Sequence, residues 1–198
     1  MAMALSSIGP TLAAYWSAYG GLRALASSPF VLLALGLTAM LFPVWSEPEW
    51  WELPMGMLPD LLGFSLGAFA FIVGFGNERF LNTMAGRDVG EDVSPYMVVT
   101  SAMLHFILCQ VLALFLGLVA SAAYQVVVPG WFAELNSILR PAFWGAAFFV
   151  FVYALTLVAA SALAAFEVVR WFDDSRTMER RAKAAEDARL GSDSPPSP

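Results

Sequence analysis

The sequence predicts an all-α membrane protein in which four transmembrane helices form a bundle, preceded by an interfacial N-terminal helix. Three observations support this fold class. The chain has 198 residues, 59% hydrophobic and only 13% charged, whereas soluble domains carry about 25% charged residues. Its apolar residues fall into four stretches, of which three approach or exceed the roughly 20 residues that cross a bilayer. Its basic residues gather on one side of the resulting topology.

The four predicted spans cover residues 29–45, 58–76, 97–128 and 142–167, within a membrane domain at 29–172. The first span is short and has Pro43 near its exit. The third exceeds one bilayer thickness, so we expect it to tilt, to extend past the membrane or to break. Pro141 opens the fourth span, since proline suits the first turn of a helix.

Both ends of the chain differ in composition from this domain. Residues 1–28 combine aromatic side chains with Arg23, as an interfacial helix does, although Gly20 and Gly21 weaken it and a free N-terminal arm is the alternative. No basic segment precedes the first apolar stretch, so we expect no cleaved signal peptide. Residues 173–198 form a charged cytoplasmic tail with a disordered end. We expect either a solubilising helix or a docking helix for a cytoplasmic partner or for anionic lipid.

The distribution of basic residues predicts the sidedness of the spans. With four spans, nine of the ten Lys and Arg residues fall on one side: Arg23, Arg79, Arg87, Arg170, Arg176, Arg180, Arg181, Lys183 and Arg189. Arg140 alone falls on the other. The positive-inside rule therefore predicts an inner-membrane, multi-pass protein with both termini and the 77–95 loop in the cytoplasm.

Residues 58–80 organise the predicted bundle. Gly63 and Gly67 lie four residues apart and share one face of the second span, where small side chains let another helix backbone approach closely. Ser65 lies roughly 200° around the helix from Gly63 and faces a different neighbour. The glycine face is therefore either a helix contact within one chain or a surface for self-association or pore lining.

Asp60 stands at the start of the same span. In the first turn of a helix, a carboxylate interacts favourably with the helix dipole. Alternatively, a ring of Asp60 side chains in an oligomer would attract cations, as in cation-selective pores.

His105 and Gln110 are polar residues inside the third span, where polar groups are costly and often functional. Ser101, His105 and Cys109 share one face, which would suit metal binding, a proton relay or a pore. One histidine is an incomplete zinc site, however. The alternative is a neutral His105 bonded to a neighbouring helix, with Gln110 joining helices by hydrogen bonds.

Composition also excludes several functions. The net charge of −6 gives no basic surface for nucleic acid, and one cysteine allows neither an internal disulfide nor a cysteine-built zinc site. The sequence contains no HExxH, GxSxG or glycine-rich phosphate loop. We therefore expect no enzymatic activity, no cofactor and no metal.

One short segment resembles a known family. Residues 74–80, GFGNERF, resemble the end of the pore helix in bacterial bestrophin-type chloride channels, where an apolar helix also runs into Gly-Phe followed by Asn, Arg and aromatic residues. The tryptophan-rich pattern that follows in that family is missing here, and no pore residue is assigned from the resemblance. In size and layout the chain is also similar to small four-span membrane components of bacterial anti-phage systems.

These observations favour a non-enzymatic inner-membrane protein that forms homo-oligomers and either permeabilises the membrane or scaffolds a cytoplasmic partner. A setting in bacterial stress or anti-phage defence fits the layout. A small channel or transporter subunit with a housekeeping substrate is the alternative, and an intramembrane enzyme using His105 is a third.

Overall fold

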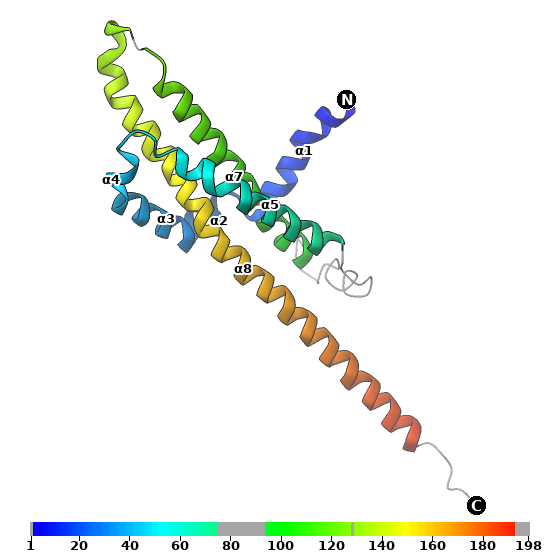
Figure 1. Cartoon of the computed structure of the whole chain (residues 1–198). Helices are drawn as coiled ribbons and strands as arrows, with labels where there is room; N and C mark the ends of the chain where they lie inside the picture. The colour runs from blue at the N-terminus through cyan, green and yellow to red at the C-terminus, as the bar shows by residue number, and fades with distance from the viewer. Residues whose placement is uncertain (1, 75–93, 128, 193–198) are drawn as a thin grey trace, which may run out of the picture.

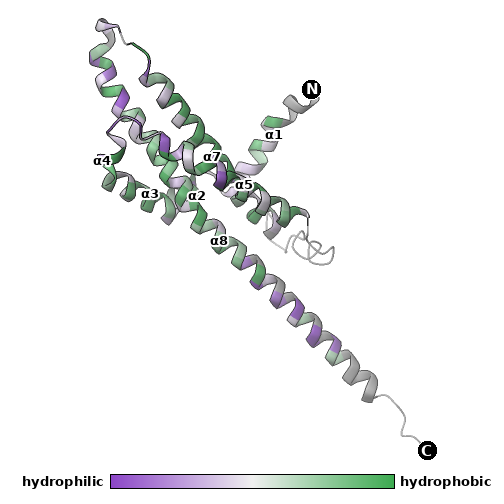
Figure 2. Ribbon diagram, viewed as in Figure 1, coloured by the Kyte–Doolittle hydropathy of each residue, from purple (hydrophilic) through white to green (hydrophobic). Residues whose placement is uncertain are grey.

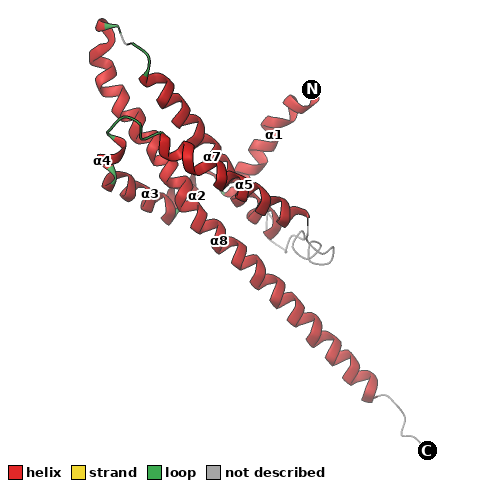
Figure 3. Ribbon diagram, in the orientation of Figure 1, coloured by secondary structure: helices red, strands yellow, loops and turns green. Residues whose placement is uncertain are grey.

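The computed structural model describes residues 2–74, 94–127 and 129–192, and this part of the chain consists of helices joined by short loops, without a strand (Figure 3). The all-helical prediction is therefore confirmed. Most of the predicted 77–95 loop, including Arg79 and Arg87, lies outside the described residues. The GFGNERF segment, apart from its first residue, also lies outside them. The last six residues of the tail lie outside them as well.

Three helices are long and apolar enough to cross a membrane: α5 (Glu52–Gly74), α7 (Pro95–Tyr124) and the first part of α8 (Ala133–Ser192). A fourth span arises if α2 (Gly21–Ser27) and α3 (Pro29–Met40), which meet at an angle of 56°, count as one bent element. Figure 2 shows the hydrophobic colouring along these helices. The structure thus supports a membrane protein with three to four spanning helices.

The N-terminal region forms two helices where the sequence predicts one. α1 (Ala2–Tyr19) is followed by Gly20, whose φ is +94°, and by Gly21, whose φ is +64°. Glycine adopts this left-handed conformation without the steric cost that a side chain adds. The two glycines therefore redirect the chain between α1 and α2.

The first predicted span, residues 29–45, is also divided. α3 ends at Met40, and α4 (Phe42–Trp45) follows after Leu41. Pro43 has no backbone N–H to continue the hydrogen bonding of α3, and its ring favours a new first turn. The helix over this stretch is therefore too short to cross a bilayer unless α2 extends it.

α8 is longer than predicted, because neither Pro141 nor the boundary at residue 173 interrupts it. It runs for 60 residues, and its second half projects away from the other helices and carries hydrophilic residues among hydrophobic ones (Figures 1 and 2). Pro141 removes the hydrogen bond to the carbonyl of Ser137. Both residues are exposed, so another polar group can satisfy that carbonyl.

The long helices alternate in direction. α7 lies between α5 and α8, and α3 packs against α8. Along α7, His105 meets Tyr153 and Tyr124 meets Trp144, so α7 and α8 are antiparallel. The loops that follow α4 and α7 consequently lie at the same end of the molecule.

Aromatic side chains gather at that end. Trp51 lies 5.3 Å from Tyr124 and 5.7 Å from Trp144 between ring centroids, and Trp50 lies 5.7 Å from Phe148. Tryptophan and tyrosine are enriched where a membrane meets water. This arrangement, which we call the aromatic end, is consistent with a position near one membrane surface.

Trp45 holds α4 against α8 by close packing on a glycine. A Cβ added to Gly145 would lie 3.1 Å from the Trp45 ring. The indole Nε1 of Trp45 also donates a hydrogen bond of 2.8 Å to the carbonyl of Thr38. Gly145 therefore provides the space that lets Trp45 lock the end of α3 and α4 onto α8.

We predict that Gly145→Leu lowers the stability of the folded protein, because the new side chain collides with Trp45. Overpacking of this kind costs about 1–3 kcal/mol. Thermal unfolding in mild detergent, followed by tryptophan fluorescence, measures the change. Gly36→Leu is the matched control, since a Cβ at Gly36 meets no atom within 4 Å. Equal melting temperatures for the two variants would contradict this packing.

Candidate functional site

His105 lies at the centre of a buried hydrogen-bond network that joins three helices. Its side chain is 6% exposed. Nδ1 lies 2.6 Å from the hydroxyl of Tyr15 on α1, and Nε2 lies 3.1 Å from the hydroxyl of Tyr153 on α8. The hydroxyls of Tyr153 and Tyr19 are 3.4 Å apart. We call these four residues the His105 network.

The Tyr15 phenol is protonated in this network, because burial is the largest cause that raises its pKa to about 12. Tyr15 shares one hydrogen bond with Nδ1 of His105, and Tyr153 shares another with Nε2. The tautomer of His105 determines which group donates in each bond. Every hydrogen bond of the ring is satisfied by side chains of the chain itself.

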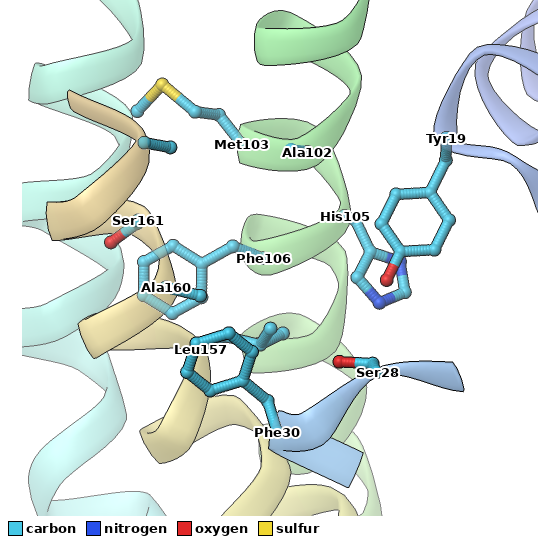
Figure 4. A pocket seen from close by; sticks show the side chains of 11 residues that line it. Tyr19, Ser28, Phe30, Ala102, Met103, His105, Phe106, Leu157, Ala160 and Ser161 are labelled. Atoms are coloured by element: carbon cyan, nitrogen blue, oxygen red, sulfur yellow. The ribbon is translucent and has the colours of Figure 1, made fainter. Parts of the chain in front are cut away.

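Ring contacts reinforce the same attachment. The Tyr19 ring stacks on His105 with centroids 4.1 Å apart and planes inclined by 22°, and Figure 4 shows the two rings facing each other. The side chains of residues 8–14 of α1 are exposed. α1 is therefore held to the bundle by its C-terminal end, while its earlier turns project away from α7 (Figure 1).

A cavity of about 130 Å³ opens beside His105 and Tyr19. Besides His105 and Tyr19, Ser28 and Ser161 contribute polar atoms, and the other lining residues are apolar (Figure 4). None of the described residues that line the cavity carries a carboxylate. Such a cavity can hold a small apolar molecule or a short segment of a lipid chain, with His105 and Tyr19 at one wall.

The other polar groups near His105 do not form a cluster of metal ligands within the described residues. The Cys109 sulfur lies 3.6 Å from Nε2 of His105 and is buried, but Cys109 does not line the cavity. Within the described residues, no three His, Cys, Asp or Glu side chains come together as a metal site requires. Ser101, which was predicted to share a helix face with His105 and Cys109, donates its hydrogen bond to the carbonyl of Val98.

Gln110 joins α7 to α5 in a fully buried position. Its Nε2 donates a hydrogen bond of 2.9 Å to the Ser65 hydroxyl, which donates in turn to the carbonyl of Leu61 at 2.6 Å. The Gln110 Oε1 finds no hydrogen-bond partner among the described residues. Gln110 and Ser65 therefore connect the two helices, in the way that polar residues link membrane helices.

Gly63 and Gly67 lie on the opposite side of α5, as their angular distance from Ser65 requires. Both are exposed, and a Cβ added at either position would meet no atom within 4 Å. Within the part of the chain that the structure describes, the glycines make no close contact with another helix. We call this side of α5, with Gly63 and Gly67 at its centre, the glycine face.

Asp60 shares the glycine face rather than the first turn of a helix. α5 begins at Glu52, so Asp60 lies about 12 Å along the axis from the helix start at 1.5 Å per residue. At that distance the helix dipole contributes little. Asp60 is exposed, and none of the described residues forms an ion pair with it.

The partners of His105 were not predicted from the sequence. The aromatic residues of the N-terminal segment, Tyr15 and Tyr19 among them, were expected only to anchor an interfacial helix, and Tyr153 was not singled out. A hydroxyl in the middle of an apolar span is costly unless it is hydrogen-bonded, so Tyr153 carried a signal that was available in the sequence. The pairing of Tyr15 with His105, 90 residues apart, had no such local signal.

Comparisons with protein-family models, with curated proteins and with solved structures find no match to this chain. Its function is therefore inferred from its own residues, above all the His105 network, the Gln110–Ser65 hydrogen bond and the glycine face.

We predict that Tyr15→Phe and His105→Ala loosen the attachment of α1, because each removes a hydrogen bond between α1 and α7. One such bond contributes roughly 0.5–1.5 kcal/mol, which corresponds to about a two- to tenfold faster hydrogen exchange. Exchange mass spectrometry of peptides from residues 8–27 measures the effect. Tyr96→Phe serves as the control on α7. Unchanged exchange in both variants would show that α1 is held by other contacts.

Proposed function

We propose that the chain is a non-enzymatic inner-membrane protein that self-assembles through the glycine face of α5 and then permeabilises the membrane or scaffolds a cytoplasmic partner. The observation that carries the proposal is the division of α5 into two sides. Ser65 is hydrogen-bonded to α7, whereas Gly63 and Gly67 on the other side face open space.

The energetics of helix association in lipid favour this interpretation. Lipid chains are as apolar as leucine, so exposed apolar side chains gain little from contact with another helix, whereas glycines allow close backbone packing. α5 is also the least enclosed span, with 17% of its most apolar stretch buried against 39% for α7 and 44% for α8. A second copy of α5 is the simplest partner, because a small-residue face is self-complementary about a twofold axis.

Asp60 supports the permeabilising branch of the proposal. It lies on the glycine face and has no ion-pair partner among the described residues. Assembly through this face would bring Asp60 side chains from several copies toward one another. Rings of acidic side chains select cations in membrane pores, so an assembled pore would conduct cations in preference to anions.

The second half of α8 supports the scaffolding branch. Arg170, Asp173, Arg180 and Lys183 are all exposed, and this part of the helix projects from the bundle without covering it (Figure 1). A solvated helix with both signs of charge can dock a cytoplasmic protein. An operon position beside stress or anti-phage genes would fit this role.

A second candidate is a small channel or transporter subunit with a housekeeping substrate. The observation that favours it is the His105 network beside the 130 Å³ cavity, since polar groups at membrane depth often mark a transport path. His105→Ala separates the two candidates. Loss of transport with intact assembly would favour the second candidate, whereas an effect confined to the attachment of α1 would favour the first.

We predict that Gly63→Leu and Gly67→Leu weaken self-assembly, because each places a bulky side chain where two α5 backbones would meet. Native mass spectrometry and crosslinking in mild detergent measure the oligomer, and we expect its population to fall about tenfold or more. Gly36→Leu is the control, since Gly36 is an equally open glycine on α3. A monomeric wild type, or equal loss at all three positions, would refute assembly through this face.

The proposed topology places both termini in the cytoplasm. The alternating helix directions support it, since they bring the loops after α4 and α7 to the aromatic end. We predict that reporter fusions at residues 50 and 134 are active outside the cytoplasm and that fusions at 90 and 190 are active inside. An outward reporter at residue 90 would overturn the topology.

A further inference from the structure

A cavity at the aromatic end combines one cation with polar and aromatic groups. Its volume is about 180 Å³, and its polar lining residues are Arg140, Asn136 and Tyr124. Leu139, Phe143 and Val126 are among the apolar residues of the same wall. None of the described lining residues carries a carboxylate. A cavity that is cationic and polar in one part and apolar in another matches an amphipathic anion.

The guanidinium of Arg140 packs on the aromatic ring of Trp144. Its Cζ lies 5.0 Å from the centroid of the Trp144 ring, a cation–π geometry. None of the described carboxylates forms an ion pair with it. A guanidinium on an aromatic face keeps its N–H edge available, and this planar fork suits the oxygen atoms of a phosphate.

The surroundings indicate what kind of anion reaches this position. The Trp51 ring packs edge-on against Trp144 and tilted against Tyr124, and tryptophan and tyrosine lie at the level of lipid headgroups in membrane proteins. Asn136 is four residues from Arg140 on α8, so their side chains lie on the same helix face. A phosphate at this level belongs to a phospholipid, whose acyl chains can continue along the apolar wall.

We propose that Arg140, Asn136 and Tyr124 bind the phosphate of a phospholipid headgroup, with Trp144 positioning the guanidinium. Arg140 supplies the charge, while the Asn136 amide and the Tyr124 hydroxyl donate to the remaining phosphate oxygens. The site depends on insertion of the chain into a membrane, and it is independent of self-assembly through α5.

The test measures lipid binding to the delipidated full-length protein in mild detergent. Native mass spectrometry with added phosphatidylglycerol is expected to show one lipid that stays bound at activation energies that remove the others. Arg140→Gln should weaken this binding about tenfold, as expected for the loss of charge-assisted hydrogen bonds. Asn136→Ala should weaken it by a smaller factor without changing the net charge.

Two controls separate this site from general attraction between basic residues and lipids. Arg170→Gln removes an exposed charge from the far end of the α8 span, outside the cavity, and should leave the retained lipid unchanged. Glycerol phosphate, added as a soluble phosphate without acyl chains, should not displace the lipid at millimolar concentration. Equal lipid retention in Arg140→Gln and wild type, or equal loss in Arg170→Gln, would overturn the site. Displacement by glycerol phosphate would assign it to a soluble phosphate instead.

Discussion

The hydrogen bond between Gln110 and Ser65 determines how α5 is oriented in the bundle. It joins two helices at a fully buried position, and the Ser65 hydroxyl donates its own hydrogen bond to the carbonyl of Leu61 within α5. In an apolar environment, rotating α5 away from α7 would leave the Gln110 amide without its partner, at a cost of about 1–3 kcal/mol, whereas Ser65 would keep its hydrogen bond within α5. The bond therefore fixes which side of α5 turns inward.

The outward side follows from this constraint. Since side chains advance by about 100° per residue on a helix, fixing Ser65 against α7 places Gly63, Gly67 and Asp60 on the opposite face. The same helix thus packs within its own chain on one side and presents a close-packing surface on the other. The proposed self-assembly, the proposed pore and its acidic lining all depend on this one rotation of α5.

Helix periodicity predicted the two opposite sides of α5 from the sequence. The opposition of Ser65 to the two glycines and the presence of polar interhelical contacts at His105 and Gln110 both follow from residue type and spacing. The length of the helices was harder to predict. The early start of α5 depends on the aromatic end, where a Cβ added at Gly117 would lie 3.3 Å from the Pro54 ring, and it is this start that moves Asp60 away from the first turn.

Other features depend on contacts between distant parts of the chain. The partners of His105 come from α1 and α8, and no local pattern links them to it. α8 continues through Pro141 because the first section of the helix is exposed, so the lost hydrogen bond costs little. From the sequence alone, the proline therefore predicts a helix boundary that the structure does not have. The break at Gly20 and Gly21, by contrast, follows from residues whose conformational freedom is evident in the sequence.

A cysteine scan along α5 tests the rotation most directly. In a Cys109→Ser background, single cysteines at positions 62 to 68 are oxidised in native membranes, and disulfide-linked dimers are measured on gels. We predict that dimer formation peaks at positions 63 and 67 and is lowest at 65, and that adding Gln110→Leu removes this pattern. A peak at position 65, or a pattern unchanged by Gln110→Leu, would contradict the account.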